Sequence, residues 1–402
     1  MTSEAGPVEL PNALLPTRYA VNRRLVLLAT GMFAIGTDSF VIAGLLSTIA
    51  NDLNVSIAVA GQLITTYALC YAIFTPITAV ITANWRRQSV LLTGLLLFIL
   101  GNIISAFGTT FFLVLVGRGV SGLGAATFAP MASATATAIV SEKKRASALA
   151  VIMVALSTAT AFGAPIGTVI GTVLSWRYTF LIVAAVAVVA AIGVAISLNH
   201  APAGNALSLK TRLRPLKDRR VLLILFTTFL VLSGLYITYS YIGVVFDRAT
   251  QGSGVTLALL IFVWGIAGTA GSLVSGHLTD RIGSRIVINT SLILLALNFA
   301  ILPWASGTLG YSIIALLVWG FFGWGFVIPQ QHHLIESAPE NAAILLSLYA
   351  MAVYGGTSVS GAVGAGAATV FGYHQLPLIG AAFILCGLVV SEYARSKIAQ
   401  DT

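Results

Sequence analysis

The sequence predicts an all-α membrane protein whose twelve transmembrane helices form two pseudo-symmetric six-helix bundles. The first observation is composition: 58% of the 402 residues are hydrophobic and only 8% are charged, whereas a soluble domain carries about 25% charged residues. The second is that apolar runs of about 20 residues, long enough to cross a bilayer, recur along the chain. The third is that one long polar connection divides these runs into six and six. No soluble core could bury this much apolar surface.

The apolar runs follow one another through mostly short connections. Each is predicted to form one helix, because a helix pairs its own backbone groups and lipid offers them no other partner. Twenty helical residues reach about 30 Å, which is the thickness of the hydrocarbon layer. The approximate limits are 25–49, 57–82, 89–108, 110–137, 146–174, 178–198, 221–245, 255–278, 286–305, 310–331, 343–371 and 376–393.

The long polar connection covers residues 199–220 and is predicted to be a cytoplasmic linker. It separates a first bundle at residues 21–198 from a second bundle at 221–394, with short tails at 1–20 and 395–402. Two equal halves of six helices are typical of transporters that are built from related bundles.

Basic residues are unevenly distributed over the predicted loops. If the N-terminus is cytoplasmic, 18 of the 21 lysines and arginines lie in cytoplasmic segments, and only Arg177 and Arg248 lie in outer loops. Cytoplasmic loops of membrane proteins are enriched in these residues. We therefore expect a multi-pass protein of the cytoplasmic membrane with both termini in the cytoplasm. The same distribution accounts for the net charge of +9 without a nucleic-acid partner.

Two ionisable residues lie deep inside predicted spans. Asp38 is near the middle of the first span, and Arg118 is about nine residues into the fourth. An ionisable group at mid-membrane costs at least about 2.5 kcal/mol on insertion scales and marks a functional site by default. Their depths allow a proton-coupling pair, directly or through water. Asp38 would carry the proton and Arg118 would control its charge state; alternatively, Arg118 only braces the bundle through backbone carbonyls.

Small residues interrupt the fourth and fifth spans. Gly122 and Gly124 follow Arg118, and small residues let helices approach closely. On the fifth span a proline removes a backbone donor and favours a kink. We predict roles in conformational gating and helix packing, with simple tight packing as the alternative. The fifth-span residues concerned are Gly163, Pro165, Gly167 and Gly171.

The turn after the eighth span combines one acid with several bases. Such a turn can form ion pairs in one conformation and release them in another, which makes a gate. The alternative is ordinary anchoring of positive residues at the cytoplasmic face. The residues of this turn are Gly276, Asp280, Arg281, Gly283 and Arg285.

Aromatic residues of the seventh and tenth spans are candidates for a substrate cavity. Rings that face a cavity bind flat, apolar or cationic molecules by stacking and cation–π contact. The alternative is that they are interfacial or packing residues. The four candidates are Tyr236, Tyr239, Trp319 and Trp324.

Four segments, in the expected order, together resemble the major facilitator superfamily. Specifically, the chain is similar to the twelve-span drug–proton antiporter branch and its bacterial sugar-efflux and chloramphenicol-resistance members, over residues 22–395. The segments are the turn Gly276-x-x-x-Asp280-Arg281-x-Gly283-x-Arg285, the fourth-span Arg118-x-x-x-Gly122-x-Gly124-Ala125-Ala126, the fifth-span Gly163-Ala164-Pro165-x-Gly167-Thr168 with Trp176-Arg177-x-Thr179-Phe180, and Gly36–Gly61.

The chain departs from the family pattern in three places. Ser121 stands where the fourth-span signature often has Gln, and Ala83 stands where the loop between the second and third spans usually has an Asp. In the related exporters the acid at the position of Asp38 is usually Glu. Because Asp is one methylene shorter and reaches less far, its contact with Arg118 is either direct or made through a bridging water.

The resemblance implies a proton-coupled antiporter that exports small lipophilic molecules or drugs by alternating access. The alternatives are a sugar or metabolite efflux permease, an uncoupled facilitator and, more remotely, a non-transporting membrane sensor or enzyme. No phosphate-binding GxxxxGK[ST] stretch, metal cluster or nucleophile–base pair is visible. We therefore expect no enzyme activity, no cofactor besides the proton gradient, and a monomer whose partners are substrate, protons and lipid.

Overall fold

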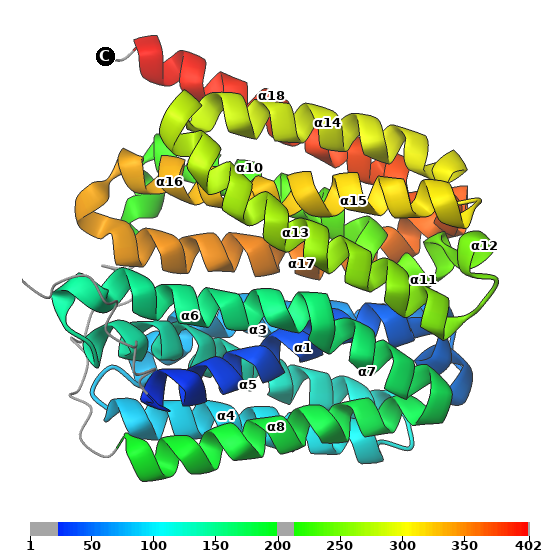
Figure 1. Cartoon of the computed structure of the whole chain (residues 1–402), viewed down its shortest axis with the longest axis horizontal. Helices are drawn as coiled ribbons and strands as arrows, with labels where there is room; N and C mark the ends of the chain where they lie inside the picture. The colour runs from blue at the N-terminus through cyan, green and yellow to red at the C-terminus, as the bar shows by residue number, and fades with distance from the viewer. Residues whose placement is uncertain (1–22, 199–212, 401–402) are drawn as a thin grey trace, which may run out of the picture.

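The computed structural model describes residues 23–198 and 213–400, and these residues are almost entirely helical. The predicted N-terminal tail, residues 1–20, lies outside the described residues, as does most of the predicted linker. The fold class predicted from the sequence is confirmed: the described chain forms helices without strands, arranged as two groups (Figure 1).

The first group, the N bundle, contains the six spans that precede the linker. Its spans are antiparallel neighbours joined by short turns, so the basic turns gather at one end of the bundle and the less charged turns at the other. We call these the basic end and the opposite end. The helices are α1 (Arg23–Asp52), α2 (Ile57–Ala60), α3 (Gln62–Ile81), α4 (Arg87–Phe107), α5 (Phe111–Ala138), α6 (Arg145–Thr158), α7 (Ala164–Ile170) and α8 (Trp176–Ser197).

The fifth span is divided by two π-helical turns. They occupy Ala159–Gly163 and Gly171–Ser175, on either side of α7. Helical residues follow one another without a gap over 56 residues, Glu142–Ser197. The chain nevertheless turns back at Ser175, whose backbone is extended at φ −164° and ψ 141°, so this stretch contains two spans. The eleven membrane-length stretches of the described chain therefore correspond to twelve crossings.

The second group, the C bundle, repeats this plan after the linker (Figure 1). Its boundaries differ from the prediction at the C-terminus: residues 395–400, expected as a tail, continue the last helix, because nothing after Arg395 stops it. The helices are α10 (Arg219–Tyr239), α11 (Ile242–Val245), α12 (Asp247–Thr250), α13 (Gly254–Ile282), α14 (Ser284–Ala305), α15 (Leu309–Gly325), α16 (Val327–Ser337), α17 (Ala342–Phe371) and α18 (Leu376–Gln400).

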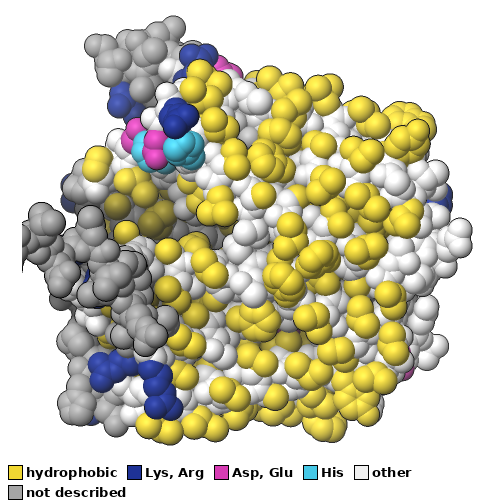
Figure 2. Space-filling model, in the orientation of Figure 1, with side chains coloured by type: hydrophobic (Ala, Val, Ile, Leu, Met, Phe, Trp, Pro, Cys, Tyr) yellow, Lys and Arg dark blue, Asp and Glu magenta, His cyan; other side chains and the backbone are white. Residues whose placement is uncertain are grey.

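The bundles pack against each other mainly in the half nearer the opposite end. One cluster of buried apolar side chains combines residues of both, including Phe40 and Tyr239. In the basic half each bundle has its own core, one containing Leu28 and Leu91 and the other Leu225 and Leu345. Figure 2 shows the surface hollowed at this end, beside the basic side chains. The two bundles therefore join at one end and separate at the other.

Hydrophobic side chains cover the middle of the visible face (Figure 2). Large apolar residues such as Phe112, Leu273 and Trp304 are more than 70% exposed. A soluble monomer rarely exposes such extensive apolar surface. This surface fits the hydrocarbon of a bilayer.

Candidate functional site

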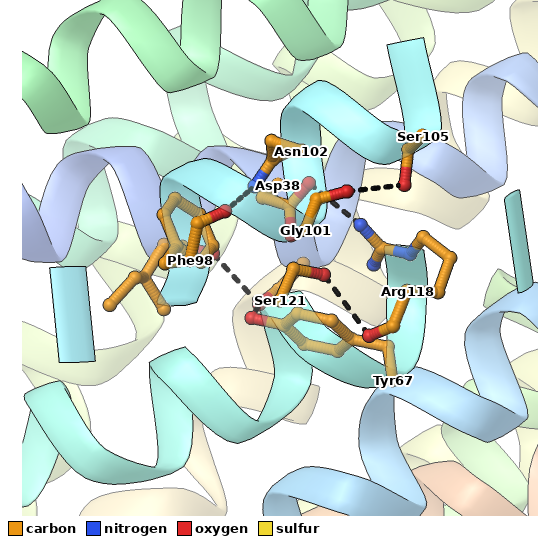
Figure 3. Close-up of polar contacts among 10 residues, drawn as sticks. Asp38, Tyr67, Phe98, Gly101, Asn102, Ser105, Arg118 and Ser121 are labelled. Carbon is orange, nitrogen blue, oxygen red and sulfur yellow. Dashed lines mark hydrogen bonds and ion pairs between the residues drawn. The ribbon is translucent and has the colours of Figure 1, made fainter. Parts of the chain in front are cut away.

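Asp38 and Arg118 form a direct ion pair in the middle of the N bundle. Arg118 Nη1 donates to Asp38 Oδ1 over 2.7 Å (Figure 3), and both side chains are completely or almost completely buried. Of the two possibilities, direct contact and a bridging water, the structure has the direct contact. Small residues on α5 let its neighbours approach closely, so the long Arg118 side chain reaches the shorter acid itself.

Aromatic rings complete the surroundings of the guanidinium. The Tyr67 ring of α3 lies 4.3 Å from the Arg118 carbon Cζ, and the Phe180 ring of α8 lies 5.6 Å from it. A cation against an aromatic face is stabilised by about 2 kcal/mol when both are desolvated. Tyr67 is held in turn by Ser39, whose hydroxyl donates to the tyrosine hydroxyl over 3.0 Å. Sequence reasoning missed Tyr67 and Phe180, because nothing in a span marks which aromatic faces a charge.

Several polar atoms around the ion pair have no hydrogen-bond partner among the described residues. They are Asp38 Oδ2, Arg118 Nε and Nη2, Asn102 Oδ1 and Thr37 Oγ1. Asn102 lies on α4 close to the pair (Figure 3), and its amide donates to the Phe98 carbonyl. Leaving a buried polar group unpaired costs about 1–3 kcal/mol, so native sites keep such atoms for a reason. Polar Asn102 inside an apolar span was a signal that the sequence offered.

The α5 glycines provide the close approach that the pair needs. A Cβ on Gly122 would overlap the Tyr67 main chain, and one on Gly124 would overlap the Phe98 main chain. These two positions therefore press α3 and α4 against α5. The geometry is that of tight helix packing.

The fifth-span residues pack against α1 on the other side of the site. Gly163 faces Thr37, Gly167 faces Val41 and Gly171 faces Leu45, one helical turn apart. Pro165 is buried in the first turn of α7, directly after a π-helical turn. A proline has no backbone N–H to donate to the preceding turn, and π-helical turns are frequent at functional sites. Gly163 therefore contacts α1 at Thr37, the residue directly before Asp38.

The four candidate cavity aromatics lie in one cluster with two further rings. Phe40 of α1 contacts Tyr236, Tyr239 and Trp324, with ring centroids 6.4, 5.8 and 5.9 Å away. Trp264 of α13 joins the same cluster. Sequence reasoning missed Phe40 and Trp264, since packing between the two bundles assembles them.

These rings are unequally accessible. Tyr239 and Trp319 are buried, and Trp319 packs against Phe299 inside the C bundle. Tyr236 and Trp324 are partly exposed. The Tyr239 hydroxyl donates to the Phe40 carbonyl over 3.1 Å and so ties the two bundles together. In this conformation only Tyr236 and Trp324 of the set have exposed ring surface.

The charged turn after α13 is organised around Gly283, whose φ of 83° disfavours any side chain. Arg285 extends from this turn to Glu392 of α18, 2.6 Å away, and Asn289 also donates to Glu392. This ion pair lies within the C bundle. Asp280 and Arg281 are exposed, and Asp280 borders a hollow of about 650 Å³ that His332 and Glu336 also line. Gly276 lies one turn before them with room for a side chain.

Metal binding has no support in the described residues. They contain no group of three or more His, Cys, Asp or Glu that could hold a metal ion. The two cysteines, Cys70 and Cys386, are free. The groups that the site offers for chemistry are a carboxylate, a guanidinium and the side chains that surround them.

Two six-helix bundles, one of which holds a buried ion pair at its centre, have the architecture of a membrane transport protein. The family model described as Major Facilitator Superfamily matches residues 28–361. The chain belongs to this superfamily of transporters.

Known proteins similar to the chain include both named exporters and proteins of general transport description. The inner membrane transport protein YdhP of Escherichia coli K12 is 30% identical and covers 92% of this chain and 95% of its own length. A chloramphenicol resistance protein of Streptomyces lividans is 38% identical over 64% of this chain and 67% of its own. A probable sugar efflux transporter of Helicobacter pylori is 29% identical over 88% and 89%.

A solved structure supports the fold. The nucleoside transporter NupG, crystallised as a point mutant, matches with a TM-score of 0.76 and 14% identity over 93% of this chain and 100% of that one. At this identity the match concerns the fold alone.

Proposed function

We propose that the protein is a proton-coupled exporter of small lipophilic molecules or drugs that works by alternating access. The observation that carries this proposal is the buried Asp38–Arg118 pair, in which Asp38 Oδ2 has no hydrogen-bond partner in the part of the chain that the structure describes. A carboxylate with one free oxygen in an apolar interior is a natural proton acceptor, since protonation removes the buried negative charge. No cofactor is needed besides the proton gradient.

Arg118 sets the strength with which Asp38 holds a proton. Burial favours the neutral acid, while the guanidinium favours the carboxylate. A proton arriving at Oδ2 leaves the Arg118 charge without its counterion, and the cation then depends on the Tyr67 and Phe180 faces. Two charge states of one site can in this way favour two arrangements of the bundles.

The basic end is proposed to face the cytoplasm, as the positive-inside rule requires. Both termini then lie inside the cell, and the hollow at the basic end opens to the cytoplasm. A drug in the cytoplasm or inner leaflet would enter from this side. We propose that one chain is the working unit, since both bundles are present in it.

The partly exposed rings of Tyr236 and Trp324 are proposed to receive the substrate. Their faces suit flat apolar or cationic molecules. The similarity to a chloramphenicol resistance protein supports this substrate class. The Arg285–Glu392 pair is proposed to steady the basic end of the C bundle rather than to bridge the bundles, because both partners belong to that bundle.

A second candidate is efflux of sugars or other polar metabolites. The similarity to a probable sugar efflux transporter favours it, and the unpartnered Asn102 Oδ1 would suit a polar substrate. A susceptibility and export panel in an efflux-deficient host, with chloramphenicol-like drugs and sugars side by side, separates the two. An uncoupled facilitator is distinguished by a protonophore, which leaves its transport unchanged.

The test of proton coupling is the substitution Asp38→Asn in proteoliposomes. It removes the ionisable group and keeps the size of the side chain, so uptake driven by a pH gradient should fall at least about a hundredfold, as expected when a proton-transfer group is lost. Substrate exchange without a gradient should persist, because it needs no net proton transfer. Gradient-driven uptake at the wild-type rate would refute the assignment of Asp38.

A further inference from the structure

One side chain of the C bundle lies inside the core of the N bundle. Tyr354 of α17 packs with the basic-half cluster whose other described members all belong to residues 25–198. Its ring stacks on Tyr71 of α3, with ring centroids 3.5 Å apart and planes 17° apart. Because the two bundles otherwise have separate cores in this half, this stack is a bridge across the seam between them.

The bridge is connected to the ion pair by a short series of side-chain contacts. The Tyr71 ring, on which Tyr354 stacks, lies 6.4 Å from the Tyr67 ring between centroids, and the Tyr354 hydroxyl lies near the side chains of Tyr71 and Ser39. Ser39 follows Asp38 in α1 and donates to the Tyr67 hydroxyl over 3.0 Å. The Tyr67 ring in turn lies 4.3 Å from the Arg118 guanidinium. Tyr354 is therefore two side chains away from the cation that pairs with Asp38.

Four side chains link Asp38 to the seam in the described part of the chain. Arg118 of α5 contacts Asp38, the Tyr67 ring of α3 lies against that cation, and Tyr354 of α17 stacks on Tyr71, whose ring neighbours Tyr67. The fifth and sixth spans contribute small and apolar side chains such as Gly163 and Phe180 to its surroundings. Of these groups, Tyr354 alone belongs to the other bundle.

We propose that Tyr354 is a positioning residue that couples the charge state of the Asp38–Arg118 pair to the relative position of the two bundles. This inference rests on the proposed proton-coupled function and adds the element that transmits it. When Asp38 becomes neutral, the Arg118 guanidinium moves toward the Tyr67 ring. The Tyr67–Ser39 contact then changes, and the hydroxyl of Tyr354 loses or gains its partner there. The stack of Tyr354 on Tyr71 then changes, and the distance between the two bundles at the basic end changes with it.

The experiment measures the distance between the bundles at the basic end. Spin labels are placed at Ser141 of the N bundle and Ser337 of the C bundle, after replacing Cys70 and Cys386 with Ala. Neutralising the acid by Asp38→Asn should shift the distance distribution in this parent. In the Tyr354→Phe and Tyr354→Ala backgrounds the same substitution should produce no shift. Non-additivity of this kind is the signature of direct coupling.

The matched control is Tyr349→Phe. Tyr349 lies on the same helix, and its buried hydroxyl has no partner and belongs to the C bundle's own core. This variant should keep the full Asp38→Asn shift. Tyr354→Phe keeps the ring and loses only the hydroxyl, so it should fold normally while gradient-driven uptake falls about tenfold, within the usual range of coupling between sites.

Each outcome decides the inference separately from the proposed function. An Asp38→Asn shift that persists in both Tyr354 variants would overturn the role of Tyr354 and leave proton coupling intact. A shift lost in Tyr354→Ala but kept in Tyr354→Phe would overturn the hydroxyl pathway. No shift in the parent, while Asp38→Asn still abolishes uptake, would show that the pair does not act through this seam. Proton coupling itself is judged by uptake in the Asp38→Asn variant.

Discussion

Arg118 holds the centre of the N bundle through three contacts at once. It makes a 2.7 Å hydrogen bond to Asp38 and stands against the faces of Tyr67 and Phe180. A buried ion pair is weak evidence of net stability, because desolvation of two charges offsets their attraction. Removing one partner is different, because the remaining charge is buried alone. Arg118 therefore has a proposed role in function, and its removal is also expected to lower the stability of the fold.

Substituting Arg118 separates these contributions. Arg118→Ala leaves Asp38 without a cation and should abolish coupling while lowering stability by up to about 3–5 kcal/mol. Arg118→Lys keeps the charge but loses the planar stacking surface, so it should retain part of both. Thermal unfolding in detergent and gradient-driven uptake in liposomes measure the two effects. Normal coupling in Arg118→Ala would reduce this residue to a brace of the bundle.

Individual residues show how far the sequence could lead. Asp38 and Arg118 stood out because charge is rare at membrane depth, and the structure places them in contact. That contact needs no bridging water, because helix spacing decides reach and glycines set the spacing of the helices around α5. Sequence reasoning missed Tyr67, Phe40 and Trp264. Each lies in an apolar span, where the neighbouring residues do not show which way its ring faces.

The helix α5 illustrates how an element positions the site. Its small residues are not equivalent, although all look alike in the sequence. Gly122 and Gly124 press against the main chains of α3 and α4, whereas Gly119 faces Cys70 Sγ and Thr66 Cγ2 at an ordinary 3.6 Å. The difference follows from the direction that each residue faces around the helix.

This difference yields a matched pair of substitutions. Gly124→Ala should force α4 away from α5 and lower stability by about 1–3 kcal/mol, the usual cost of overpacking. Gly119→Ala, on the same helix, should be neutral or stabilising by up to about 1 kcal/mol because alanine favours the helix. Thermal unfolding of both variants is the measurement. Equal loss of stability in the two would contradict the packing described for α5.

The fifth span shows a second effect at this scale. Two π-helical turns flank α7, and the first lies against the stretch of α1 that contains Thr37 and Asp38. A glycine- and proline-rich run predicted an interruption here. Its form, a π-helical turn instead of a simple kink, depends on the packing of α1 and could not be read from the run.

At the scale of the whole molecule, the two bundles meet in the half away from the basic end. Tyr239 of α10 donates to the carbonyl of Phe40, and Gly361 of α17 lies against Thr65 of α3. Alternating access requires these contacts to separate when the opposite end opens. A covalent link across them should therefore stop the cycle.

The pair Thr65→Cys and Gly361→Cys provides such a link. A Cβ on Gly361 would lie 3.4 Å from Thr65 Cβ, close to the roughly 3.5–4.5 Å that a disulfide requires. In a background without Cys70 and Cys386, oxidation should abolish transport, and a thiol reductant should restore it. Each single cysteine variant is the control and should not respond to oxidant. Unchanged transport in the fully cross-linked double variant would show that this seam stays closed during turnover.

The sequence by itself determined the class of fold, the approximate spans and the two charges at depth. Those properties follow from composition and from the cost of placing polar groups in lipid, which act residue by residue. Only the tertiary structure decided that Asp38 and Arg118 touch, that Phe40 and Trp264 join the aromatic cluster, and that Tyr354 crosses between the bundles. These contacts join segments that lie far apart in the chain. Their geometry depends on helix rotation and spacing, which the apolar pattern of a membrane span does not encode, because lipid and neighbouring helices accept the same side chains.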